Sequence, residues 1–257
     1  MILLLGGTAD TRRLARRLIG AGRRLLVSTT TDIPLDVGGA GVRRRCGPLD
    51  DAALTQLIHR HAIETIVDAT HPYAGEIRER ACRIAAQQNI RYLTLVRPPV
   101  IAPDEAGVEF ADDHPSAARR AFAHGRPVLV TIGSRHIQPY TAEAAATALP
   151  LFVRVLDHPA SRGACRSAGL SDDQILTGRG PFTTQQNIAD FRRHRIGVVV
   201  TKDSGQAGGT REKLAAARET SCRIVVIRRP PVDPSRAFRD VDTLMAALEA
   251  ASLQADK

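Results

Sequence analysis

The feature of this sequence that most limits its fold is a regular alternation of short apolar runs and longer helical segments. The apolar runs are four or five residues long, as at 2–5 and 196–200, and they are the length of buried strands. Strands that alternate with helices predict parallel sheets built from crossover units. We therefore predict an α/β protein with two Rossmann-like domains, each a parallel sheet flanked by helices, and a cleft between them.

A proline-rich break divides this rhythm into two series. Segment 97–99 (RPP) can continue neither a helix nor a central strand. The first series predicts strands at 2–5, 25–28, 42–45, 65–68 and 92–96, with helices at 11–19, 52–61 and 76–88. The second predicts strands at 128–131, 152–155, 174–177, 197–201 and 223–227, with helices at 115–123, 142–148, 184–194, 210–219 and 241–251. The sequence thus predicts domains of residues 1–98 and 99–257.

Charge and cysteine usage narrow the choice of partners. The net charge is +9, from 36 Lys+Arg against 27 Asp+Glu, and Arg pairs well with carboxylates and phosphates. Tryptophan is absent, aromatic residues are 4%, and no zinc-finger or basic-zipper pattern occurs, so we expect no nucleic-acid partner. The four cysteines are isolated, which predicts no metal site. The apolar start is too short for a membrane segment, so we expect a cytoplasmic protein. As a separate expectation, the protein is a monomer.

A glycine-rich turn joins the first predicted strand to the first helix. Gly6 and Gly7 let the backbone approach a ligand, Thr8 offers a hydroxyl, and the helix N-terminus offers amide groups to an anion. The pattern lacks part of the GxGxxG fingerprint. The two open interpretations are a cofactor-binding turn and an ordinary turn capped by threonine.

The end of the second predicted strand bears on cofactor choice. Ser28, Thr29 and Thr30 stand where NAD enzymes carry the acidic residue that holds a ribose 2′-hydroxyl, and Arg45 ends the next strand. Hydroxyls with an arginine suit a 2′-phosphate, which favours NADPH/NADP. The alternative is that these residues belong to an exposed edge strand.

The end of the fourth predicted strand carries a polar, proline-stiffened segment. Thr70, His71, Pro72 and Tyr73 follow it directly, and we expect them to line the same cofactor site. A solitary histidine is more often a structural hydrogen-bonding group than an acid catalyst. We therefore predict that His71 contacts the cofactor and does not transfer protons.

Polar loops also follow the strands of the second series. Segment 201–205 (TKDSG) brings a cation, a carboxylate and a hydroxyl to the edge where open parallel sheets bind ligands. Each loop alone is compatible with ordinary turn chemistry, but together they suit a ligand with several carboxylates. The predicted substrate-binding residues are Gly133, Ser134, Arg135, Arg154, Gly180, Ser204, Gly205, Gly208, Gly209 and Lys213.

Taken in order along nearly the whole chain, these motifs resemble the precorrin-6A reductase family of cobalamin biosynthesis. The matching pieces include segments 4–8 (LLGGT), 68–74 (DATHPYA), 131–134 (TIGS), 180–182 (GPF) and 201–205. The resemblance implies hydride transfer from NADPH to precorrin-6A, giving precorrin-6B. It also implies an N-terminal NADP domain and a C-terminal domain for the acidic tetrapyrrole.

The resemblance also directs attention to the proton that accompanies the hydride. Lys202 and Asp203 are the catalytic candidates, and the alternative is that they form an orienting ion pair while water supplies the proton. A short-chain dehydrogenase or epimerase is a second hypothesis, but the chain has no YxxxK pair. A third is an NADP-sensing or nucleic-acid-binding regulator. The choice between a metal-free and a cobalt-loaded macrocycle stays open.

Overall fold

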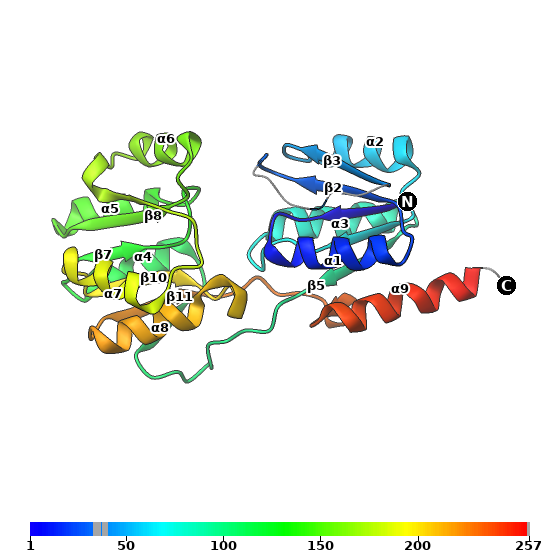
Figure 1. Cartoon of the computed structure of the whole chain (residues 1–257). Coiled ribbons are helices and arrows are strands. Elements are labelled where there is room, and N and C mark those ends of the chain that lie inside the picture. The colour runs from blue at the N-terminus through cyan, green and yellow to red at the C-terminus, as the bar shows by residue number, and fades with distance from the viewer. Residues whose placement is uncertain (33–36, 38–40, 256–257) are drawn as a thin grey trace. The chain divides into compact units, whose positions relative to one another are not determined.

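The computed structural model describes residues 1–32, 37 and 41–255, and these form two compact α/β units (Figure 1). One unit comprises Met1–Pro98 together with Pro230–Lys257, and the other comprises Pro99–Arg229. The predicted fold class of two parallel sheets flanked by helices is confirmed, whereas the cleft between them stays a prediction. The break after Pro98 lies where the sequence predicted it, but the range 99–257 is wrong for its last segment.

The first unit contains a six-stranded parallel sheet in the described residues, with the order β12-β5-β4-β1-β2-β3. Because β1 lies between β4 and β2, the strand order reverses at β1, and ligands of open α/β sheets bind at such a point. The predicted strands 2–5 and 65–68 match β1 and β4 residue for residue. The strands are β1 (Ile2–Leu5), β2 (Leu25–Thr29), β3 (Val42–Cys46), β4 (Thr65–Asp68), β5 (Arg91–Leu95) and β12 (Ala237–Phe238).

Both faces of the first sheet are covered, which explains why its central strand β1 is apolar throughout. Helices α1 (Ala9–Gly20) and α9 (Val241–Ala255) share one core cluster with Leu4 of β1. Helices α2 (Asp51–His61) and α3 (Gly75–Gln87) share the other cluster with Leu3. Successive side chains of a strand point to opposite faces, so β1 contributes to both cores.

The C-terminal segment returns to the first unit, which corrects the predicted domain range. Strand β12 pairs in parallel with β5 in the register Ala237 to Thr94, and the N–H of Val96 donates to the carbonyl of Phe238 at 2.8 Å. Leu244 of α9 is fully buried in the core of this unit. A two-residue strand after a proline-rich stretch has no sequence periodicity, so the sequence could not predict this pairing.

The second unit repeats the arrangement, with the order β6-β11-β10-β7-β8-β9 among the described residues. Here the order reverses between β7 and β10. Strand β6 was not predicted from the sequence. The strands are β6 (Val108–Ala111), β7 (Val128–Val130), β8 (Leu151–Val155), β9 (Ile175–Thr177), β10 (Val198–Lys202) and β11 (Arg223–Ile227).

The helices of the second unit also cover two faces. Helices α7 (Thr184–Arg193) and α8 (Thr210–Glu219) pack on Leu129 and Val199. Helix α4 (His114–Ala123) packs against β10, β11 and α5 (Gln138–Thr147), while α6 (Pro159–Ser167) packs against β8. In the described parts of both units, no helix combines the length and the apolar character that crossing a membrane requires.

Candidate functional site

The turn after β1 is shaped by one threonine side chain. The Oγ1 of Thr11 accepts hydrogen bonds from the N–H groups of Gly7 at 3.0 Å and Thr8 at 3.1 Å. A Cβ on Gly6 would lie 2.2 Å from the Cγ2 of Thr11, so this position requires glycine, and Gly7 adopts a φ of +119°. The Thr8 hydroxyl donates to the carbonyl of Ala69 at 3.1 Å, which joins the ends of β1 and β4 where the strand order reverses.

The segment after β4 is held by a buried ion pair that the sequence did not indicate. Asp68 is fully buried and accepts from the Nε of Arg78 at 3.2 Å and from the hydroxyl of Tyr92 at 2.9 Å. The guanidinium of Arg78 also donates to the carbonyls of Pro72 at 3.0 Å and His71 at 3.3 Å. Arg78 therefore fixes the backbone of the polar segment while it neutralises Asp68.

The side chains of this segment lie at the carboxyl edge of the sheet. The Nδ1 of His71 accepts from the N–H of Tyr73 at 3.3 Å, and the two ring centroids are 5.7 Å apart. The Oγ1 of Thr70 is buried and has no hydrogen-bond partner among the described residues. A buried hydroxyl without a partner costs free energy, so its position next to the glycine-rich turn is consistent with a group that a ligand satisfies.

The proposed 2′-phosphate residues are brought together, but the arginine has other partners. Arg45 donates to the hydroxyl of Ser28 at 2.9 Å and to the carbonyls of Cys46, Gly47 and Pro48 at 3.0–3.2 Å. The guanidinium thus closes the turn after β3. Thr29 is buried and donates within its own turn, while Thr30 is exposed. The NADP preference stays a prediction.

In the second unit, Asp203 joins the two ends of the unit's chain. Its Oδ2 accepts from the N–H groups of Val100 at 2.9 Å and Ile101 at 3.2 Å. Its Oδ1 accepts from the N–H of Gly205 at 3.0 Å and from the Nη2 of Arg229 at 3.1 Å. Asp203 as a whole residue is 4% exposed. Its contacts argue for a structural role, and its assignment as a proton donor stays a prediction.

Lys202 belongs to a cluster of basic groups near α4. Burial, followed by the charge of Arg135, lowers the pKa of Lys202. Burial first, then Lys202 and His136, lower the pKa of His114 to about 4. The Nδ1 of His114 lies 3.1 Å from the hydroxyl of Tyr140. Lys202 thus lies among other bases, and such perturbed groups at a sheet edge are typical of functional sites.

A second basic cluster lies near α7 and α8. Arg154 donates to the Oδ1 of Asn187 and the Oδ2 of Asp190, both at 2.7 Å, and its guanidinium lies 4.4 Å from the ring centroid of Phe182. Its Nε is buried without a partner in the described part of the chain. Burial first, then Arg154, lowers the pKa of Lys213 to about 8, while Glu212 and Asp203 act in the opposite direction.

The predicted glycines of this edge permit its close turns. A Cβ on Gly208 would lie 2.2 Å from the Cβ of Ser204. Positive φ angles occur at Gly133 (+87°), Gly205 (+76°) and Gly209 (+70°), where residues with a side chain are strained. Ser134 and Gly180 also lie in loops of this edge, after β7 and β9.

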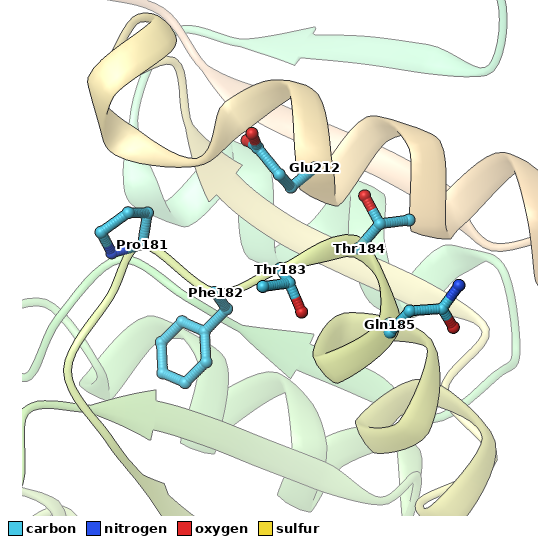
Figure 2. Close-up of a pocket in the computed structure, with 6 residues that line it drawn as sticks. All are labelled: Pro181, Phe182, Thr183, Thr184, Gln185 and Glu212. Carbon is cyan, nitrogen blue, oxygen red and sulfur yellow. The ribbon is translucent and has the colours of Figure 1, made fainter.

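A pocket of about 400 Å³ lies between the loop before α7 and the start of α8. Residues 181–185 and Glu212 line it, and Figure 2 shows Glu212 on α8 and the residues Pro181 and Phe182 on the loop before α7. The Oε2 of Glu212 is buried and has no hydrogen-bond partner in the described residues. This pocket therefore contains an acceptor that a bound molecule could satisfy.

Comparison with known proteins identifies the family. Residues 1–249 match the family described as Precorrin-6x reductase CbiJ/CobK. The chain belongs to this family. The family resemblance inferred from the motifs is thereby confirmed, and membership of a reductase family implies a reducing cofactor.

Individual relatives extend over the same length. A cobalt-precorrin-6A reductase of Priestia megaterium is 29% identical, covering 96% of this chain and 98% of that protein. A precorrin-6A reductase of Rhodococcus erythropolis is 33% identical, covering 96% and 95%. The solved structure of CobK precorrin-6A reductase is 26% identical with a TM-score of 0.79, covering 97% of this chain and 96% of that one.

The residues at the carboxyl edge of the first sheet fit a dinucleotide cofactor. The glycine-rich turn and the unpartnered hydroxyl of Thr70 meet where the strand order reverses, which is the position that dinucleotides occupy in such sheets.

Sequence reasoning missed Asp68, Arg78, His114 and His136. Asp68 stood inside a noted motif, but nothing in the sequence signalled its distant partner.

Proposed function

We propose that this chain is an NADPH-dependent reductase that converts precorrin-6A to precorrin-6B, or the cobalt-loaded equivalents. The observation that carries the proposal is the family match over residues 1–249, together with relatives named precorrin-6A and cobalt-precorrin-6A reductase. The two sheet edges support it, because one offers amides and hydroxyls and the other offers cations.

The first unit is proposed to hold NADPH, which supplies the hydride when bound. The turn at Gly6, Gly7 and Thr8 lets the backbone approach the cofactor, and Thr70 offers a hydroxyl at the same point of strand reversal. Ser28 and Arg45 would meet the 2′-phosphate at the end of β2. His71 and Tyr73 would position the nicotinamide by ring contact.

The second unit is proposed to hold the macrocycle through its carboxylate arms. Arg135 in the loop after β7, Arg154 within β8 and Lys213 in the first turn of α8 supply cations, and charge-assisted hydrogen bonds to carboxylates are stronger than neutral ones. Lys202 is the candidate proton donor, because a lowered pKa makes its ammonium group a stronger acid. Asp203 fixes the backbone directly after Lys202.

The test follows cofactor and macrocycle together. Purified protein is mixed with precorrin-6A and either NADPH or NADH, and the absorbance of both chromophores is recorded. We expect stoichiometric loss of NADPH and conversion of the macrocycle, with slower turnover of NADH. Deuterium at C4 of NADPH should appear in the product. Loss of NADPH without a change in the macrocycle would contradict the proposal.

A further inference from the structure

Two histidines outside every noted motif lie face to face in the second unit. His114 begins α4, and His136 lies in the loop between β7 and α5, 22 residues later. Their ring centroids are 4.4 Å apart and the planes differ by 15°, so the rings are stacked. His114 comes shortly after β6 and His136 shortly after β7, which places the pair at the carboxyl edge of the second sheet.

Tyr140 fixes how His114 is presented. Its side chain is fully buried, and burial raises the pKa of the phenol well above its usual range, so the hydroxyl keeps its proton. Among the described residues, the hydrogen-bond partner of this hydroxyl is the Nδ1 of His114, at 3.1 Å. A buried hydroxyl that donates to no acceptor is unfavourable, so the phenol donates to Nδ1. His114 then carries its own proton on Nε2, which faces away from the buried phenol.

The surroundings of this pair are rich in positive charge. The charges of Lys202 and His136 both act on His114, and the charge of Arg135 acts on Lys202. Asp113 is the acidic group that acts on His114, and its carboxylate is already engaged at the start of α4 by the N–H of Ser116 at 2.7 Å. Basic groups gathered in this way repel one another, and a bound anion relieves the repulsion.

We propose that His114, His136 and Arg135 form a seat for one carboxylate arm of the macrocycle, next to Lys202. Tyr140 is a positioning residue, because it acts through His114. The inference rests on the proposed function and adds to it a site that orients the macrocycle relative to Lys202. A phosphate of the cofactor has the same anionic oxygen chemistry, so the experiment separates the two sources.

The direct test uses NMR on the full chain with labelled histidines, at fixed pH. Resonances are assigned with His114→Gln, His136→Gln and the control His124→Gln, which alters the opposite end of α4. Glutarate, a simple dicarboxylate, should shift the signals of His114 and His136 saturably and leave His124 unmoved. The ¹⁵N shifts of His114 should show a proton on Nε2, and Tyr140→Phe should change that pattern.

Binding of NADP⁺ is measured in the same way. If NADP⁺ shifts His114 and His136 as glutarate is expected to, the anion is a cofactor phosphate and the proposed seat for the macrocycle is overturned. Shifts with neither ligand also overturn it. These binding measurements require no turnover, so they test the carboxylate seat separately from the proposed function.

The kinetic test asks which parameter changes. His136→Gln and His114→Gln should each raise the KM for the macrocycle about tenfold, which corresponds to about 1.4 kcal/mol. Their KM for NADPH should not change, and His124→Gln should resemble the wild type. A fall in kcat with an unchanged KM for the macrocycle would assign the histidines to another step and refute the seat. Thermal unfolding of each variant identifies any effect that comes from misfolding.

Discussion

The two sheets have the same strand order around their reversal points, but their carboxyl edges are equipped differently. At the first edge, Arg78 and Arg45 have partners within their own unit. Arg78 binds Asp68, and Arg45 binds carbonyls of its own turn. At the second edge, Lys202 and Lys213 lie among other cations and have lowered pKa values. One frame can therefore present neutral donors or charged groups, depending on its loops.

The edges also share one device. Asp68 is the last residue of β4 and Asp203 directly follows β10. These are corresponding strands, each next to the strand where the order reverses. Each carboxylate accepts from the N–H two residues later, Thr70 at 2.8 Å and Gly205 at 3.0 Å, and each binds an arginine. The shared device indicates that both acids stabilise the edges.

The largest effect is expected when this device is removed. Asp68→Asn should lower the free energy of unfolding by about 3–5 kcal/mol, because it leaves the buried Arg78 without its charged partner. Asp203→Asn should have a smaller effect, because Arg229 is more exposed than Arg78. Urea unfolding measures both. An Asp203→Asn protein of wild-type stability that has lost turnover would show that Asp203 is catalytic, and the parallel with Asp68 would fail.

The glycine-rich turn should be the next most sensitive position. Gly6→Ala places a Cβ against Thr11, so we expect the free energy of unfolding to fall by about 1–3 kcal/mol. We expect the binding of NADP⁺ to weaken as well. Gly20→Ala is the control, because nothing lies within 4 Å of its Cβ at the other end of α1. It should be neutral or slightly stabilising. Calorimetric titration with NADP⁺ is the measurement, and equal behaviour of the two variants would contradict the expectation.

The partly dehydrated lysine of the second edge should make stability depend on pH. The pKa of Lys213 is about 8 in the folded chain and 10.5 when unperturbed, so between these values the unfolded chain binds more protons. Stability contributed by this group therefore rises as pH increases from about 8 to 10.5. Lys213→Met should be more stable at pH 7, on the order of 1–3 kcal/mol, and should lose this slope. Denaturation at several pH values tests this, and parallel curves would refute it.

The smallest expected effect concerns cofactor choice at the first edge. Arg45→Ala should weaken NADPH about tenfold more than NADH, about 1.4 kcal/mol, if the guanidinium also meets the 2′-phosphate. Arg43→Ala removes an exposed charge from the same strand and serves as the control. Equal losses for both cofactors would restrict Arg45 to closing its turn.

The sequence predicted the parts of this molecule that depend on local pattern. The β1 and β4 runs and the glycine-rich turn were found because apolar runs and small residues are visible within a few positions. Partners distant in sequence were not found. Asp68 meets Arg78 and Tyr92 only once the sheet forms, and His114 meets His136 only when α4 packs beside α5. Strand β12 was missed for the same reason, because its pairing depends on a neighbour more than 140 residues earlier.

That last pairing has a consequence for the order in which the protein is made. The middle unit, Pro99–Arg229, is continuous, so it can complete its sheet as soon as its last strand leaves the ribosome. The first unit begins earlier but lacks β12 and the buried Leu244 of α9 until these residues, which follow the middle unit in the chain, have been made. The N-terminal half is therefore the last to finish folding, and nascent chains stopped before residue 230 should keep the β5 edge open to other strands.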